Sequence, residues 1–158
     1  MFGEITANEI ELLNAFHLLG MTGQKELKDY LRYLLCKQYR REVMVSIFQN
    51  QLIHNLFHSI MHMIEKDDYD IAQLTRRLKQ IQELYFGIYE QVHNKYSEQI
   101  EYLDSIEIVK DFGKNSFENI NRALLTGNTI LIRIEIIDFY EGFKKLSTNK
   151  DARKIVAV

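Results

Sequence analysis

The sequence of 158 residues contains no proline and only seven glycines. Proline is the strongest helix breaker, and few glycines leave few permissive turns, so both shortages favour long helices over a β-rich fold. Tryptophan is absent as well. The single cysteine, Cys36, excludes an intrachain disulfide and a multi-cysteine zinc site. It lies in an apolar run, so we expect it to be buried or half-buried.

Neither sign of charge is in large excess, because the chain has 20 Lys and Arg and 22 Asp and Glu, which give a net charge of −2. Nucleic-acid-binding domains are usually basic, so the overall charge does not favour that class. The N-terminus has no basic region followed by an apolar run, as a signal peptide would have. The longest uncharged stretch, 43–64, contains three histidines and several amides, which make a poor membrane span. We therefore expect a cytoplasmic protein without membrane contact.

Apolar residues repeat at steps of three and four over most of the chain, which predicts an all-α helical bundle. In 43–65 they cover about half of the helical wheel, which predicts a central helix with neighbours on two sides. From 71 to 92 they follow a heptad pattern, which predicts a long helix. The pattern then slips by four residues, so we expect a bend at 93–97.

These patterns divide the chain into three predicted parts. Residues 1–42 are predicted to form an αα-hairpin, with a capping box at Thr6 and Glu9 and a glycine of positive φ, Gly20, at the first helix end. Residues 43–146 are predicted to form the bundle, after a helix bend near 40–42. The polar and basic residues 147–158 are predicted to be a flexible tail.

Within the bundle, the acidic stretch 66–70 predicts a turn in which Asp68 or Asp70 caps the next helix. Further breaks are predicted at 113–116 and at 126–128, where glycines occur. Residues 130–136 alternate in the manner of a strand, and only 105–109 could pair with them. Because the chain is otherwise helical, we predict that both segments are helical.

The long heptad helix carries more aromatic residues than its core positions require, which suits an interface with another protein. We expect the chain to self-associate, as a dimer, and to bind a partner protein through four residues of this helix: Tyr85, Tyr89, Val92 and Tyr96. No phosphate-binding loop, nucleophile elbow or Cys–His pair is present. The leading hypothesis is a non-catalytic regulatory or adaptor protein that needs no cofactor and acts through helix-mediated contacts.

Nucleic-acid binding is the first alternative, although the acidic net charge does not favour it. Tyrosines alternate with a run of basic residues in the predicted hairpin, comprising Lys25, Lys28, Arg32, Lys37, Arg40 and Arg41. Acidic residues interrupt this run, and a solvated helix face would explain it equally well.

Metal binding is the second alternative. Histidines one helical turn apart can share an ion, and a Glu-x-x-His pair is a ligand motif of helical-bundle di-iron sites. The candidate ligands are His54, His58, His62, Glu90 and His93. Such di-iron sites need a second Glu-x-x-His pair, which the sequence lacks, so the histidines can equally be the polar flank of a buried helix.

Residues 8–42 resemble a short helical hairpin of regulatory proteins from Gram-positive bacteria and their phages. Its first helix follows the pattern E-x-E-L-L-x-x-F-x-x-L, matched by Glu9, Glu11, Leu12, Leu13, Phe16 and Leu19. Its second helix follows G-Q-K-E-L-x-D-Y-L-x-x-L-L, matched by Gly23, Gln24, Lys25, Glu26, Leu27, Asp29, Tyr30, Leu31, Leu34 and Leu35. The resemblance implies an interaction or oligomerisation module. The helix-turn-helix reader that often accompanies this hairpin does not precede it here, so DNA reading is not implied.

Overall fold

The computed structural model describes residues 3–66, 68–101, 103 and 108–148. Throughout these residues the regular structure is helical and no strand occurs, so the all-α prediction is confirmed. The six α-helices are α1 (Ala7–Leu18), α2 (Met21–Phe48), α3 (Gln51–Met63), α4 (Ile71–Ser97), α5 (Ile108–Thr126) and α6 (Thr129–Thr148).

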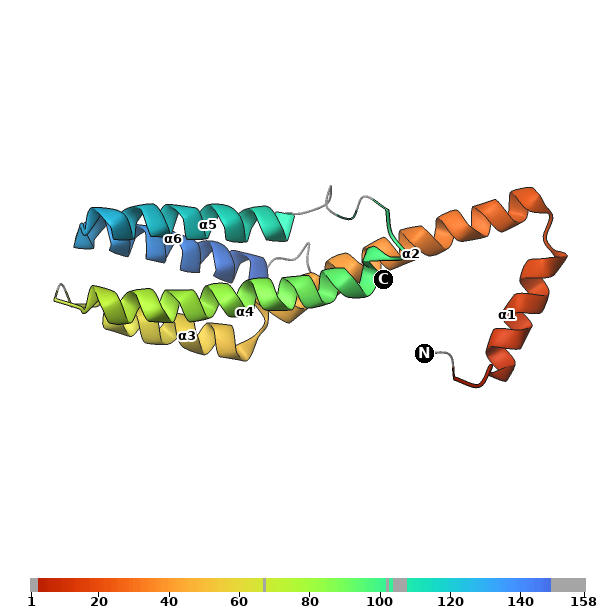
Figure 1. The fold of residues 1–158 in the computed structure, drawn as a ribbon, viewed down its shortest axis with the longest axis horizontal. Coiled ribbons are helices and arrows are strands. Elements are labelled where there is room, and N and C mark those ends of the chain that lie inside the picture. Colours follow the sequence, from red (N-terminus) through yellow and green to blue (C-terminus); the bar gives the residue numbers. More distant parts are fainter. Residues whose placement is uncertain (1–2, 67, 102, 104–107, 149–158) are drawn as a thin grey trace.

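Five of these helices pack into an elongated bundle in which α4 is central (Figure 1). The second half of α2 and then α3 lie along one side of α4, and α5 lies along another. Helix α6 packs against α5 and α2. The heptad positions of α4, including Leu74, Leu78 and Ile81, are buried against these neighbours. The heptad pattern therefore marks the core of the chain itself.

The boundary between α2 and α3 differs from the prediction. Helix α2 passes through 40–42 without a break, because Tyr39 and Val43 continue one buried face. The chain breaks instead after Phe48, and the Asn50 side chain accepts a hydrogen bond from the Ile53 N–H at 3.1 Å, as an N-cap does. The predicted central helix 43–65 is therefore divided between α2 and α3.

The two ends of α4 agree well with the sequence pattern. Asp70 is its N-cap, and the carboxylate accepts a hydrogen bond from the Ala72 N–H at 2.9 Å. The helix ends at Ser97, where the heptad pattern slips. The chain stays close to the bundle after this end, since Ile100 and Leu103 are both buried.

Helix α5 runs through 113–116, so the predicted break there is wrong. The break at Gly127 is confirmed, because this residue has a φ of 66° and separates α5 from α6. Residues 129–137 are helical as predicted, and so are 108–109 of the second ambiguous segment, while 105–107 lie outside the described residues. In the predicted tail, 147–148 belong to α6 and 149–158 lie outside the described residues.

Helix α1 does not join the bundle. It lies at the far end of α2, where the chain turns at Leu19 and Gly20 (Figure 1). Gly20 has a φ of −70° and is the N-cap of α2, so its predicted positive φ is wrong. The predicted capping box at Thr6 and Glu9 is confirmed. Helices α1 and α2 do not pack along their lengths as a closed hairpin would, and the contacts that hold them lie near the corner.

Candidate protein interface

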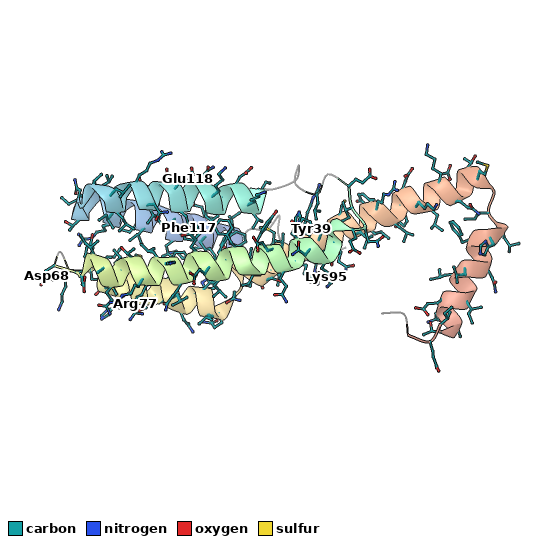
Figure 2. The ribbon with its side chains drawn as sticks, in the orientation of Figure 1. Tyr39, Asp68, Arg77, Lys95, Phe117 and Glu118 are labelled. Atoms are coloured by element: carbon teal, nitrogen blue, oxygen red, sulfur yellow. The ribbon has the colours of Figure 1, made fainter. Side chains whose placement is uncertain are left out.

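Helix α1 and the first half of α2 form an arm that projects from the bundle. We define the arm as residues 7–34, which comprise α1 and the first half of α2, and none of these residues is buried. Figure 2 shows its side chains extending into solvent, with no other helix opposite them. The first buried residue of α2 is Tyr39, which lies where the helix reaches the end of α4.

The surface of the arm is strongly apolar. Among the described residues, eighteen large apolar side chains are exposed, and eleven of them lie in or directly before the arm. These eleven are Ile5, Ile10, Leu12, Leu13, Leu18, Leu19, Met21, Tyr30, Leu31, Tyr33 and Leu34. Helices of a globular domain normally bury such residues, so this concentration makes the arm a candidate interface.

An estimate of area supports this point. The exposed fractions of the eleven side chains range from 39% to 90%. Burying a Leu-sized side chain removes roughly 60–120 Å² from water, so the arm offers roughly 400–800 Å² of apolar surface. The largest apolar patch of a typical monomer covers about 300–600 Å² and is often functional. The arm therefore reaches or exceeds the size at which an apolar patch indicates a binding site.

Contacts at the corner between α1 and α2 set the angle between the two helices. The Gln24 side chain donates hydrogen bonds to the backbone oxygens of Phe16 and Leu19, at 3.1 and 3.2 Å. These two carbonyl groups lie at the C-terminal end of α1, where intrahelical donors run out, and the Phe16 carbonyl accepts in addition from the Leu19 N–H at 3.2 Å. A Cβ atom at Gly23 would lie 3.3 Å from Leu19 Cδ2, so the two helices approach closely here. Gln24 thus fixes the direction in which α1 leaves α2.

The apolar stripe of α2 points away from the bundle. Leu34 precedes the buried Val43 by nine residues, which places the two side chains on opposite sides of the helix, roughly 180° apart. Leu31 and Leu34 are 49% and 39% exposed. The same helix therefore uses one side for the bundle core and leaves the opposite side uncovered.

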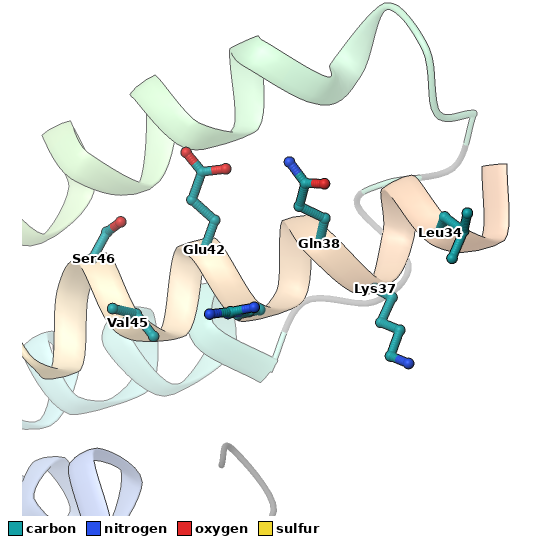
Figure 3. A pocket seen from close by; sticks show the side chains of 7 residues that line it. Leu34, Lys37, Gln38, Glu42, Val45 and Ser46 are labelled. Atoms are coloured by element: carbon teal, nitrogen blue, oxygen red, sulfur yellow. The ribbon is translucent and has the colours of Figure 1, made fainter. Parts of the chain in front are cut away.

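A shallow, open depression of about 560 Å³ continues this uncovered side toward the bundle (Figure 3). Seven residues of α2 line it, namely Leu34, Lys37, Gln38, Arg41, Glu42, Val45 and Ser46. In Figure 3, Gln38 and Glu42 point toward α4, whereas Lys37 points away from it. The depression has an apolar residue at each end and charged or amide groups between them, which suits a helical partner better than a small molecule.

The four residues predicted to contact a partner are placed elsewhere. Tyr85, Tyr89, Val92 and Tyr96 are only 0–7% exposed and pack inside the bundle. The prediction was wrong in location, because the heptad face of α4 already contacts α2, α3 and α5 of the same chain. A partner could not reach these side chains without opening the bundle.

The residues of the arm were predicted to form an αα-hairpin, and only their resemblance to a known hairpin implied an interaction module, while the partner contacts were predicted on the long heptad helix. A hairpin of two amphipathic helices has no third layer to cover its apolar side. The apolar residues of 8–35 already showed that the hairpin has an apolar side without a covering layer. This observation could have indicated an interface before the structure was known.

The six basic residues of the nucleic-acid alternative all lie on α2, but they do not form one face. Lys25, Lys28 and Arg32 fall on one side of the helix, and Arg41 follows Arg32 by nine residues, which places it roughly opposite. Arg32 also pairs with Asp29 at 3.6 Å. A phosphate backbone could contact only part of this set at once, so the geometry does not strengthen the nucleic-acid alternative.

The residues of the metal alternative are not brought together. Within the described parts of the chain, no three His, Cys, Asp or Glu side chains converge so that they could hold an ion. His54 Nε2 lies 2.8 Å from the Phe48 carbonyl oxygen, and the His58 ring packs against Tyr140 at 5.9 Å. His93 lies on α4, with its ring 6.4 Å from that of Tyr39. The remaining two candidates are apart from these, since His62 pairs with exposed Glu65 at 3.4 Å and Glu90 is exposed on α4.

A polar cluster joins α2 to the end of α4, next to the depression. The Tyr96 hydroxyl donates a hydrogen bond to Glu42 and accepts one from the Gln38 amide at 3.0 Å. Lys95 Nζ lies 2.9 and 3.2 Å from the two carboxylate oxygens of Glu42. The two members on α2, Gln38 and Glu42, lie four and eight residues beyond the arm. The cluster therefore anchors α2 where the arm leaves the bundle.

The cluster changes the acidity of its members. The hydrogen bond from Tyr96, assisted by Lys95, holds the pKa of Glu42 below its ordinary value of 4.5, although desolvation acts in the opposite direction. Burial, and then the bond to Glu42, raises the pKa of the Tyr96 hydroxyl above 10.0. The bond to Glu42 raises the pKa of Lys95 above 10.5. All three shifts favour the charge states that form the cluster at neutral pH.

We expect Glu42→Gln to reduce the dependence of stability on acid pH. A carboxylate whose pKa is lowered by folding stabilises the native state above its unfolded pKa, and this contribution disappears as pH falls through the folded pKa. Urea unfolding at pH values from about 6 down to about 3 measures it. The variant should be less stable than the wild type at the upper end and should lose less stability across the range. Glu118→Gln, at an exposed carboxylate of α5, is the control, and identical acid profiles for Glu42→Gln and the wild type would contradict the expectation.

The chain was compared with models of protein families, with curated proteins and with solved structures, and none of them matches. No helix in the described ranges is both long enough and apolar enough to cross a membrane. The function must therefore be argued from the surface of the molecule itself.

Proposed function

We propose that the chain is a non-catalytic regulatory or adaptor protein that binds another protein through the apolar surface of its arm. The observation that supports this proposal is the distribution of exposed apolar residues, since eleven of eighteen in the described chain lie at the arm. The bundle does not use the arm for its own core, because no residue of 7–34 is buried. Such a surface gains free energy when a partner covers it.

The proposal includes the setting expected from the sequence. It places the protein in the cytoplasm of a Gram-positive bacterium or in the cell that its phage infects. The hairpin resemblance of residues 8–42 supports an interaction module, and these residues cover the arm and the beginning of the depression. No cofactor has a part in the proposed function.

Photo-crosslinking from single positions tests the proposal. Leu31 is replaced by a photo-crosslinking amino acid in the full chain, which is then irradiated in the cells that produce it. We expect one or a few protein adducts of defined size, because Leu31 lies on the uncovered side of α2 and is 49% exposed. Mass spectrometry of the adducts identifies the bound protein, whether it is a second copy of this chain or a different protein.

Leu125 provides the matched control. It is 89% exposed, which is more than Leu31, but it lies at the end of α5 in the bundle. Non-specific encounters should label both positions, whereas a partner of the arm should be captured only from Leu31. Equal labelling from both positions, or no adduct from Leu31, would count against the proposed function.

A further inference from the structure

The arm has two helices of opposite charge. Residues 3–24, which include α1, contain three glutamates and no lysine or arginine. Within the arm, residues 25–34 of α2 contain three lysines and arginines and two acidic residues, and three more basic residues, Lys37, Arg40 and Arg41, follow beyond the arm. Within one chain this opposition remains largely unused, since the described residues show no ion pair between α1 and α2.

A second copy of the chain supplies the complementary surface. If two arms lie side by side around a twofold axis, α1 of each copy can lie on the apolar stripe of α2 of the other, where Lys28, three residues before Leu31, flanks the contact. Each α1 then covers an apolar stripe that its own chain leaves open, because the Gln24 corner directs α1 away from Leu31 and Leu34. Four helices result, which is the smallest common arrangement in which every helix buries an apolar stripe.

The size of the arm agrees with this arrangement. A stable interface buries about 800 Å² on each partner, of which about 55–65% is apolar. The roughly 400–800 Å² of exposed apolar surface on the arm would therefore supply the apolar part of such an interface. Elsewhere among the described residues only seven large apolar side chains are exposed, and the largest group of them, near the junction of α5 and α6, has four members, namely Leu125, Ile130, Leu131 and Ile134.

We infer that two copies of this chain form a symmetric dimer through their arms, with α1 of each copy packed on the first half of α2 of the other. The inference rests on the proposed function of the arm as a protein-binding surface, and it names the partner. The bundles of the two copies remain at opposite ends of the four-helix arm, so the depression on α2 stays next to the dimer contact.

Sedimentation velocity of the full chain over a concentration series tests the inference. We expect a reversible monomer–dimer equilibrium, with a dissociation constant on the order of 1–10 µM, that weakens as salt is added. Leu12→Gln combined with Leu31→Gln should weaken the dimer at least about tenfold, because both side chains lie in the contact. Glutamine is a good helix former and both positions are exposed, so circular dichroism and thermal unfolding of the monomer should be unchanged. Leu125→Gln, at the exposed end of α5, should leave the dimer unchanged.

Charge reversal tests the pairing of α1 with α2. Reversing charges in residues 3–24 (Glu4→Lys and Glu11→Lys) should weaken the dimer, and so should reversing charges in the first half of α2 (Lys25→Glu and Lys28→Glu). In a chain that carries all four substitutions, residues 3–24 change from three acidic residues to two basic and one acidic, and residues 25–34 become acidic, so its dimer should regain most of the lost affinity. Failure to regain it would overturn the pairing of α1 with α2.

Three other outcomes would overturn the inference. They are a monomer at all concentrations up to about 100 µM, a dimer that the arm substitutions leave unchanged, and growth into open polymers instead of a closed dimer. A monomer that still gives an adduct with a different protein from Leu31 would remove the dimer and leave the proposed function intact. A monomer that gives no adduct would remove both.

Discussion

Phe57→Ala is expected to lower the free energy of unfolding by about 3–5 kcal/mol, which corresponds to roughly 10 °C or more in the unfolding midpoint. Phe57 lies on α3 and is fully buried. Its ring lies 5.1, 5.1 and 5.0 Å from the rings of Phe139, Tyr140 and Phe143, all on α6. Alanine would remove these contacts and leave a cavity between α3 and α6 that the packed helices can close only in part.

The measurement is urea unfolding followed by circular dichroism, on both chains at the same low concentration. Leu125→Ala serves as the control, because it also removes a large apolar side chain, but from a position that is 89% exposed. We expect this control to change the free energy of unfolding by no more than about 0.5 kcal/mol. A loss below about 1 kcal/mol for Phe57→Ala would mean that its ring is not packed between α3 and α6 in solution.

The stability of the molecule is thus predicted to lie in its aromatic core, and this core was only partly visible in the sequence. The apolar periodicity of α4 correctly predicted which of its side chains would be inward-facing, since Leu74, Leu78 and Ile81 are all buried. The same periodicity could not show what covers them. Tyr85 and Tyr89 were assigned to an interface with another molecule, but α2 and α5 of the same chain cover them. Periodicity gives the direction of a side chain relative to its own helix and carries no information on its neighbour.

Helix boundaries were predicted where a side chain acts locally. Thr6 and Asp70 cap the helices that they precede, and Gly127 has the positive φ that ends a helix. The prediction failed at Asn50. Its side-chain oxygen caps α3, although the sequence around it has the pattern of one continuous amphipathic helix. Asparagine is compatible with both a helix interior and an N-cap, and only the packing of α3 beside α4 selects the second.

The candidate interface was the least predictable feature. The residues of the arm were recognised as amphipathic, and their resemblance to an interaction hairpin stays a prediction. The exposure of the apolar stripe of α2 depends in part on the Gln24 corner, which directs α1 away from that stripe. A side-chain amide that reaches back to two carbonyl groups leaves no periodic trace in a sequence, so the open angle between α1 and α2 had no sequence signal.

Gly113 shows how one residue type can have two opposite meanings. Its position in a polar stretch predicted a break, yet it lies inside α5 and is buried. A Cβ atom built there would lie 2.4 Å from Tyr85 Cε1 and 2.9 Å from Tyr85 Cζ. The Tyr85 ring is fully buried, packs edge-on against Phe117, and donates its hydroxyl hydrogen bond to the Val109 carbonyl oxygen. Glycine is therefore present because α5 passes directly over this ring.

Gly113→Ala is expected to lower the free energy of unfolding by about 1–3 kcal/mol, even though alanine is favoured over glycine in a helix by about 1 kcal/mol. The ring cannot move away without losing its hydrogen bond and its contacts, so α5 itself must shift away from α4. Gly87→Ala on α4 isolates the propensity effect, because a Cβ atom there meets nothing within 4 Å. That control should stabilise the chain by about 0.5–1 kcal/mol. Urea unfolding of the two variants should therefore give changes of opposite sign, and stabilisation by both would show that α5 does not approach Tyr85 this closely.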